Sequence, residues 1–175
     1  YGVCDQVYYD VYVSSETPFK EFEFDGYTYC YVASKCKLGI ENVHYSGGVR
    51  ITDKERTTLD SIKDMDKISG IEEVLANIDG FTSLNEEKLT GYLQEYHNQF
   101  LYQKTGFILY PYRDKLGLSH SFFEMCQSKT GKSKRYLTKE FTNGTYIKEW
   151  KLVVPDEIYK LKNGAFQDDR MDLCQ

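Results

Sequence analysis

A short triplet near the C-terminal end is the first candidate for chemistry. Glu149-Trp150-Lys151 has the E-x-K spacing of metal-dependent nucleases, in which acidic side chains hold the cation and a lysine helps to activate water. Residues 145–154 (TYIKEWKLVV) are predicted to form one strand, which is the context that such a site needs. A metal site also needs another acidic residue from upstream, and the sequence does not single one out. The simpler interpretation places Glu149 and Lys151 in solvent and Trp150 in the core, and we favour it over catalysis.

Other catalytic motifs fail on spacing. Gly131-Lys132-Ser133 is similar to the end of a phosphate-binding P-loop, but that motif requires glycine at position 126, where this chain has Cys126. No G-x-S-x-G sequence is present to anchor a hydrolase triad. The three histidines are widely spaced, and the five cysteines include no C-x-x-C pair. We therefore predict no catalytic residue, no metal and no cofactor, and a protein that binds and is not an enzyme.

The charges are unevenly distributed along the chain. Residues 129–151 hold seven basic and two acidic side chains, whereas residues 1–33 hold six acidic and one basic side chain. Nucleic acid or an acidic protein could bind the basic region, and its aromatic side chains could stack on the bases of a single strand. The same alternation is equally typical of an ordinary solvated strand, so both interpretations stay open. The residues assigned to this basic surface are Lys129, Lys132, Lys134, Arg135 and Lys151.

Alternating apolar and polar residues predict strands in the first fifty positions. The expected strands are residues 6–14, 19–25, 27–33 and 48–52, the second and third joined by a turn at Asp25-Gly26. Cysteines at positions 30 and 126 fall on apolar patterns and are expected to be small core residues.

The middle of the chain has helical periodicity. Three capping boxes, Thr52 with Glu55, Ser69 with Glu72 and Ser83 with Glu86, predict helix starts. The expected helices are residues 53–65, 69–78, 83–100, 99–116 with Pro111 as a kink or an end, and 119–126.

The last third returns to strands. Residues 134–137 and 145–154 are the expected strand pair, and Pro155 is expected to end the second strand and start a short helix at 156–160. The predicted fold class is therefore α+β, with a largely antiparallel N-terminal sheet, a central helical segment and a C-terminal strand pair.

Length and composition predict one domain, residues 1–162, followed by a polar tail, residues 163–175. No stretch approaches 18 apolar residues, so no membrane span is expected. An odd cysteine count without paired spacing favours reduced thiols and a cytoplasmic protein. The opening at Tyr1, without an initiator methionine, predicts a fragment of a longer protein.

Residues 50–60 (RITDKERTTLD) resemble the R-V-T-x-x-E-R-T-L-x-D signature of AbiEi-type antitoxins, which are bacterial transcriptional regulators of abortive-infection toxin–antitoxin systems. The signature positions in this sequence are Arg50, Thr52, Glu55, Arg56 and Asp60. Further stretches resemble the same family in the same order: 11–15 (VYVSS), 22–26 (FEFDG), 69–75 (SGIEEVL), 92–96 (YLQEY), 100–107 (FLYQKTGF), 129–137 (KTGKSKRYL) and 150–155 (WKLVVP). The signature also has a structural explanation, because it fits a strand-to-helix junction with a cap and an Arg56–Asp60 pair.

The resemblance implies an N-terminal winged helix-turn-helix that binds inverted repeats in the protein's own promoter, and a C-terminal domain with antitoxin activity. The partner toxin of this family resembles a nucleotidyltransferase and is countered without a stable protein complex. No helix-turn-helix pattern precedes the predicted strands, so we expect promoter DNA to be bound through a module that is missing from this chain.

Three hypotheses follow. The leading one is the C-terminal antitoxin and effector domain of an autoregulatory repressor in phage defence, acting by binding. The alternative is a nuclease-like or degenerate nuclease domain that uses Glu149 and Lys151. The third is a structural role, in which the aromatic strand at residues 6–14 helps to position or dimerise the DNA-binding module.

Overall fold

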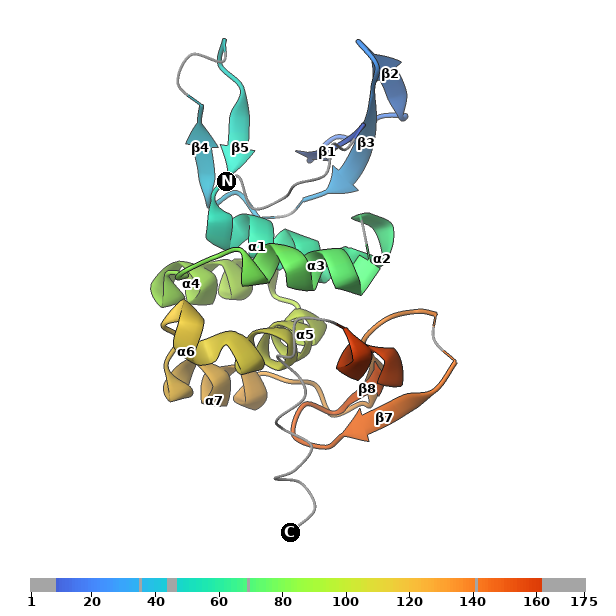
Figure 1. Ribbon diagram of the computed structural model, residues 1–175. Helices are drawn as coiled ribbons and strands as arrows, with labels where there is room; N and C mark the ends of the chain where they lie inside the picture. The colour runs from blue at the N-terminus through green and yellow to red at the C-terminus, as the bar shows by residue number, and fades with distance from the viewer. Residues whose placement is uncertain (1–8, 35, 44–46, 69, 141, 162–175) are drawn as a thin grey trace.

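The computed structural model describes residues 9–34, 36–43, 47–68, 70–140 and 142–161, and it has the predicted α+β architecture. Helices form the body of the molecule, two small sheets project from one side of it, and a third sheet packs at the opposite end (Figure 1). The N-terminal strands are β1 (Asp10–Ser15), β2 (Phe22–Phe24), β3 (Tyr27–Ala33), β4 (Ile40–Asn42) and β5 (Arg50–Thr52). The helices are α1 (Lys54–Lys63), α2 (Met65–Ile68), α3 (Gly70–Asp79), α4 (Glu86–Tyr96), α5 (Gln99–Leu109), η1 (Tyr110–Tyr112), α6 (Arg113–Leu116) and α7 (His120–Ser128). The C-terminal elements are β6 (Arg135–Tyr136), β7 (Gly144–Ile147), β8 (Leu152–Pro155) and η2 (Asp156–Lys160).

The first sheet has the strand order β1-β3-β2. The hairpin expected at Asp25-Gly26 is confirmed, since β2 and β3 pair antiparallel and both turn residues have positive φ, 50° and 78°. β1 pairs with β3 in parallel, with Asp10 opposite Thr28, and is the exception to the antiparallel pairing that the sequence predicts. A turn sets the direction only of the strands that it joins, and the direction of β1 depends on how residues 16–21 return the chain to the hairpin.

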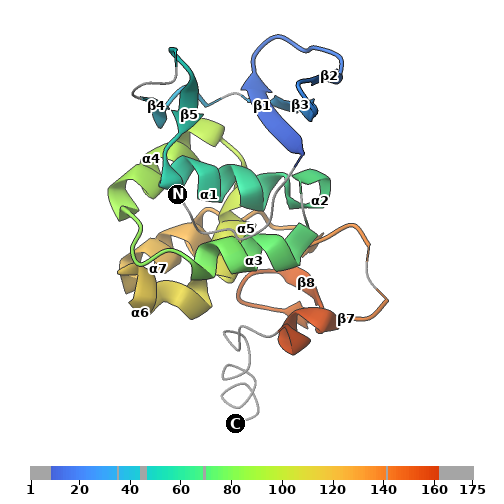
Figure 2. The same ribbon diagram turned by 45° about the horizontal axis from the view of Figure 1, so that its top comes forward.

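A second sheet contains a strand that the sequence analysis missed. β4 pairs antiparallel with β5, Ile40 lying opposite Thr52, and β5 is the shorter form of the strand expected at residues 48–52. Both sheets project from the same side of the helices as two separate arms, which Figure 2 shows from a second direction.

The predicted helices are present, except that the one expected at residues 83–100 ends at Tyr96, where His97 takes the left-handed conformation and Asn98 caps α5. Two of the three predicted caps are wrong. Asp53 caps α1 in place of Thr52, and Asn85 caps α4 in place of Ser83. Asp and Asn accept hydrogen bonds from the first helical turn at least as well as Ser and Thr. Where both kinds of residue lie near a helix start, as here, the Asp or Asn is the N-cap. Ser69 lies outside the described residues, as do residues 6–8 of the first predicted strand and the tail from 162 onward.

The predicted helix at 99–116 is divided into α5, η1 and α6. Pro111 lies in η1, where its missing N–H and fixed φ interrupt the α-helical hydrogen bonds. Gly117 then ends α6 in the left-handed conformation, with φ of 69°.

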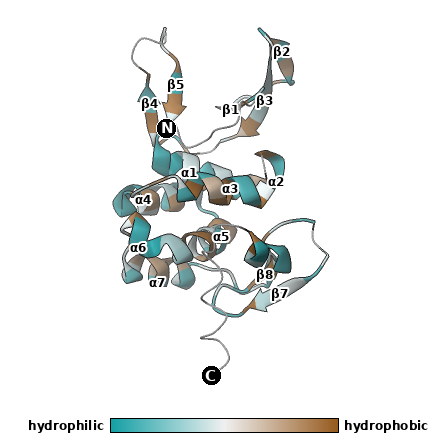
Figure 3. Ribbon diagram, in the orientation of Figure 1, coloured by the Kyte–Doolittle hydropathy of each residue, from teal (hydrophilic) through white to brown (hydrophobic). Residues whose placement is uncertain are grey.

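The core lies between the helices. The stripe predicted for α1, Leu59, Ile62 and Met65, is completely buried. Residues 101–109 of α5 are all buried, so this helix is enclosed on every side and the other elements pack around it. Figure 3 shows apolar residues where the helices face one another, and also on strands of the two arms, where Phe24 and Ile51 are exposed.

The C-terminal sheet has the order β6-β8-β7, with β8 parallel to β6 and antiparallel to β7. The single strand predicted at residues 145–154 is wrong, because a turn at residues 148–151 divides it into β7 and β8. Lys151 closes the turn with φ of 50°, and its backbone N–H donates to the Lys148 carbonyl at 3.2 Å. Trp150, at the turn, is 5% exposed, so its predicted place in the core is confirmed.

No helix within the described ranges is long and apolar enough to cross a membrane.

Two glycines inside helices give a matched pair for testing this packing. A Cβ at Gly106 in α5 would lie 2.0 Å from a ring carbon of Trp150, whereas a Cβ at Gly91 in α4 would meet nothing within 4 Å. We expect Gly106→Ala to lower the free energy of unfolding by roughly 1–3 kcal/mol, because the indole must move out of a close-packed site. Gly91→Ala should raise it by up to about 1 kcal/mol, through helix propensity alone. Urea denaturation of the two variants measures both, and a stabilising Gly106→Ala would contradict the Trp150 packing.

Candidate functional site

The buried guanidinium of Arg56 joins α1 to the chain that leads from the first sheet to the second. Nε donates to Asp60 Oδ2 at 2.9 Å, one turn along the helix, which confirms the predicted pair. Nη1 donates to the carbonyls of Cys36 and Leu38 at 2.9 and 2.7 Å, and Nη2 donates to the hydroxyl of Ser34 at 2.6 Å. Arg56 is 1% exposed, so these bonds replace water almost completely and hold Ser34, Cys36 and Leu38 against the helix.

Asp53 extends this network to α4. Its Oδ1 accepts from the backbone N–H of Arg56 at 2.8 Å as the N-cap. Its Oδ2 accepts from the Tyr92 hydroxyl at 2.6 Å and from the Lys88 ammonium at 2.9 Å. Burial alone would raise the pKa of Asp53, but the bonds from Tyr92, the helix backbone and Lys88 outweigh it and lower that pKa below its usual value. The carboxylate is therefore held ionised in a largely dry site.

Tyr96 of α4 contacts the network at Asp60 and Arg56. Its hydroxyl donates to Asp60 Oδ1, and the Arg56 guanidinium carbon lies 5.4 Å from the centre of its ring. Burial and the neighbouring Asp60 carboxylate raise the pKa of Tyr96 well above its usual value, so the hydroxyl stays a donor. Arg56 therefore has a carboxylate, three backbone or hydroxyl acceptors and an aromatic ring around it.

The remaining signature residues have different positions. Glu55 is buried, and its carboxylate accepts from the backbone N–H of Asn85 at 2.8 Å, so its predicted capping-box role with Thr52 is wrong. Thr52 shares a 2.7 Å hydrogen bond with the hydroxyl of Thr57, and Arg50 is exposed at the start of β5. Four of the five signature residues thus lie at the joint between the arms and the helices, and one lies on an arm.

Sequence reasoning missed the partners that complete this joint, Asp53, Tyr92 and Lys88. Asp53 precedes a helical pattern directly and could have been found as a better cap than Thr52. Tyr92 and Lys88 are four residues apart, which places both on one face of α4, but only the packing of α4 on α1 brings that face to Asp53.

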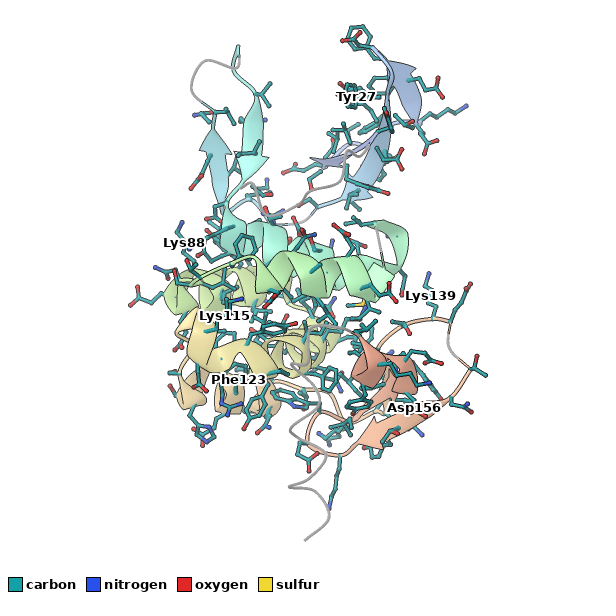
Figure 4. The ribbon with its side chains drawn as sticks, in the orientation of Figure 1. Tyr27, Lys88, Lys115, Phe123, Lys139 and Asp156 are labelled. Carbon is teal, nitrogen blue, oxygen red and sulfur yellow. The ribbon has the colours of Figure 1, made fainter. Side chains whose placement is uncertain are left out.

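The basic surface gathers on the C-terminal part of the molecule. Lys132, Lys134 and Arg135 are exposed on the loop from α7 to β6 and at the start of β6. Lys139 is exposed on the loop that follows β6 and points away from the body in Figure 4. Lys129 lies at the C-terminal end of α7.

None of the seven basic residues between 129 and 151 forms an ion pair with a described residue. Several cations elsewhere in the described chain are paired. Lys63, Lys67 and Lys115, for example, pair with carboxylates on the helical body. The basic surface therefore keeps its positive field and can attract an anion from outside the chain.

Lys151 has a structural position within this surface. Its ammonium donates to the Gly131 carbonyl at 3.1 Å and to the Thr130 hydroxyl at 3.4 Å, which ties the turn before β8 to the loop after α7. The strand context assumed for Glu149 and Lys151 is wrong, because both lie in the turn. No group of three or more His, Cys, Asp or Glu side chains that could hold a metal occurs among the described residues.

A polar hollow of about 480 Å³ lies beside the basic loop, between the end of α4, the start of α5 and the end of α7. Lys129, Thr130 and Ser128 line one side of it, and His97 and Asn98 line the other. Lys129 thus faces this hollow, and the backbone continues directly from it to Lys132 and Lys134.

One further cation is enclosed in the body. Lys104 of α5 is 4% exposed, and its ammonium lies 4.8 Å from the centre of the Phe100 ring. It forms no hydrogen bond or ion pair with a described residue, and burial lowers its pKa. No pattern in the sequence separates this lysine from the exposed ones.

Comparisons of the chain with known proteins match no family model, no curated protein and no solved structure.

The Arg56 joint predicts a large loss of stability on substitution. Arg56→Met should lower the free energy of unfolding by about 3–5 kcal/mol, because it leaves Asp60 and several acceptors buried without their donor. Arg56→Lys should recover only part of this, since an ammonium cannot reach the same set of acceptors. Arg113→Met is the matched control and should cost less than about 1 kcal/mol, because that arginine is partly exposed and its carboxylate partner is 3.9 Å away. Equal losses at the two sites would contradict the role of Arg56.

The lowered pKa of Asp53 predicts that its contribution to the free energy of unfolding depends on pH. Its pKa is lowered in the folded protein, so the stabilisation is complete above the unfolded-state pKa near 3.8 and is lost as the pH falls through the lower folded pKa. Asp53→Asn keeps a good cap but removes the charge, and should cost roughly 1.5–3 kcal/mol at pH 7. Urea denaturation between pH 7 and pH 3 should show that the free energies of unfolding of the variant and the wild type become more similar as the pH falls. Asp114→Asn, at a carboxylate that is 92% exposed, is the control and should cost less than about 0.5 kcal/mol at pH 7.

Proposed function

We propose that this chain is the C-terminal antitoxin and effector domain of an AbiEi-type autoregulatory repressor in a bacterial phage-defence toxin–antitoxin system, and that it acts by binding. The resemblance of residues 50–60 and of seven further segments supports the assignment. The observation that carries the binding role is that none of the seven cations in residues 129–151, the region of the basic surface, has an ion-pair partner among the described residues.

The two candidate regions have separate tasks in this proposal. The signature residues at the joint hold the two arms on the helical body, and the basic surface meets the ligand. Lys132, Lys134 and Arg135 are the contact residues, because they are exposed and unpaired among the described residues. Lys151 supports them by holding the loop at Gly131.

Partners and compartment follow from the same proposal. The full-length protein reads promoter DNA through a winged helix-turn-helix, and the basic surface adds contacts to phosphates. The functional partner is a nucleotidyltransferase-like toxin in the cytoplasm. A nuclease function has no specific support, because Glu149 lies in a turn and the Lys151 ammonium is bonded to the neighbouring loop.

A growth-rescue assay tests the antitoxin assignment. The toxin encoded beside this gene would be induced in bacteria together with the 175-residue chain or with the full-length protein. Rescue by the chain supports an antitoxin domain within residues 1–175, and rescue by the full-length protein alone assigns a necessary part to the DNA-binding module. An active toxin that neither of them counters would overturn the proposed function.

Charge neutralisation tests the basic surface. The triple variant Lys132→Gln, Lys134→Gln, Arg135→Gln should weaken binding of the full-length protein to its promoter. The slope of the logarithm of the binding constant against the logarithm of the salt concentration should become shallower by about 2–3, because each lost phosphate contact removes roughly 0.9 from that slope. The control triple Lys37→Gln, Lys67→Gln, Lys115→Gln changes the net charge equally at cations that are already paired. Fluorescence anisotropy over a salt series measures both. Equal losses in the two triples would show that only net charge matters.

A further inference from the structure

The outer face of the C-terminal sheet carries an aromatic row. In the register, Val153 of β8 lies opposite Tyr136 of β6 and opposite Tyr146 of β7. Side chains opposite one another in a sheet lie on the same face, so the two tyrosines flank Val153 across three strands. Their strands are about 10 Å apart, which is twice the spacing of neighbouring strands.

Burial shows which face this is. Leu152 and Val154, the neighbours of Val153, belong to the main core, whereas Val153 is buried but is not part of that cluster. Val153 therefore lies on the face away from the helices. Tyr136 and Tyr146 remain 54% and 45% exposed on that face.

A cation accompanies both rings. The Lys134 ammonium lies 5.9 Å from the ring centre of Tyr136 and 5.3 Å from that of Tyr146, and it forms no ion pair with a described residue. Lys132, Arg135 and Lys148 are exposed in the same part of the chain. Two accessible aromatic rings with a cation between them match the two parts of a nucleotide, its flat base and its phosphate.

The first sheet (β1–β3) shows that exposed aromatic rings alone do not make a site for nucleic acid. Phe24 and Tyr27 are 67% and 41% exposed, but Glu23 and Asp25 lie beside them and repel phosphate. Figure 4 places Tyr27 at the far end of its arm, away from the C-terminal sheet. Aromatic exposure and unpaired positive charge coincide on the C-terminal sheet.

We propose that Tyr136 and Tyr146 stack on unpaired nucleobases of a single-stranded nucleic acid, while Lys134 pairs with the phosphate that links them. This inference rests on the proposed binding role of the basic surface and names its ligand. It adds a contact that duplex DNA does not satisfy, because the bases of a duplex already stack on one another. The aromatic row selects single strands, and the surrounding cations bind any phosphate backbone.

Binding of labelled oligonucleotides to the 175-residue chain, measured by fluorescence anisotropy, tests the stacking. The probes are oligodeoxythymidine, oligouridine, an abasic oligonucleotide of the same length and a duplex. The single strands should bind at least tenfold more tightly than the abasic backbone. Tyr136→Ala with Tyr146→Ala should weaken their binding at least roughly tenfold and leave abasic binding unchanged, because both stacking contacts with the bases are lost. Comparison of oligodeoxythymidine with oligouridine shows whether the bound single strand is DNA or RNA.

Three controls make the outcome decisive. Tyr136→Phe with Tyr146→Phe keeps the rings and should bind like wild type. Tyr27→Ala removes an exposed ring from the acidic arm and should change nothing. If the alanine pair loosens the sheet, as circular dichroism would show, Tyr136→Leu with Tyr146→Leu keeps an apolar cover over Val153 and should lose base-dependent binding alone.

Three results would overturn the inference, and each has a different consequence for the proposed role of the basic surface. Equal affinity for base-containing and abasic strands would reject stacking and leave the basic surface as a phosphate-binding site. Absence of binding to every probe would reject both stacking and a nucleic-acid ligand for the basic surface, while the growth-rescue assay would still decide the antitoxin function. Competition by polyglutamate as strong as that by oligodeoxythymidine would assign the surface to an acidic protein instead.

Discussion

The buried guanidinium of Arg56 is the contact on which the arrangement of this protein depends. Between the first two sheets, residues 34 and 36–39 form no helix or strand, and Arg56 donates hydrogen bonds to two carbonyls and a hydroxyl of this segment. Gly39 completes the contact, because a Cβ there would lie 2.9 Å from the Cβ of Arg56. The guanidinium must be neutralised to be buried, and the Asp60 carboxylate on α1 provides the negative charge. Tyr96 on α4 donates a hydrogen bond to that carboxylate and places its ring beside the cation. One side chain therefore holds the segment between the two arms on the helices, and Tyr12 of the first arm adds hydrogen bonds to carbonyls of α2.

Charges on the two halves of the molecule are used in opposite ways. At the joint, carboxylates and cations are buried together and satisfy one another, so they stabilise the fold and present little field to solvent. On the C-terminal sheet, cations stand in solvent without carboxylates within reach among the described residues, so their field extends outward. Residues that look alike in sequence, such as Arg56 and Arg135, thus have different consequences, and burial is what separates them.

The C-terminal sheet shows how packing in the core shapes a surface. Gly106 lets the Trp150 ring approach α5, and this anchors the turn that reverses the chain between β7 and β8. The reversal brings Tyr146 back beside Val153, opposite Tyr136. Without the turn, residues 145–154 would extend as one strand, and the two tyrosines could not flank the same valine. The aromatic row on the surface is thereby linked to a glycine in the buried helix.

The sequence by itself determined the α+β class, the apolar stripes of the helices, the hairpin at Asp25-Gly26, the Arg56–Asp60 pair and the burial of Trp150. These features depend on contacts between near neighbours or on periodic burial, which local patterns encode. The parallel direction of β1, the strand β4, the turn before β8 and the partners of Asp53 were decided by the tertiary structure. Each of them depends on segments distant in sequence, as when Tyr92 meets Asp53 or Trp150 meets Gly106. No local preference distinguishes these contacts before the chain has packed.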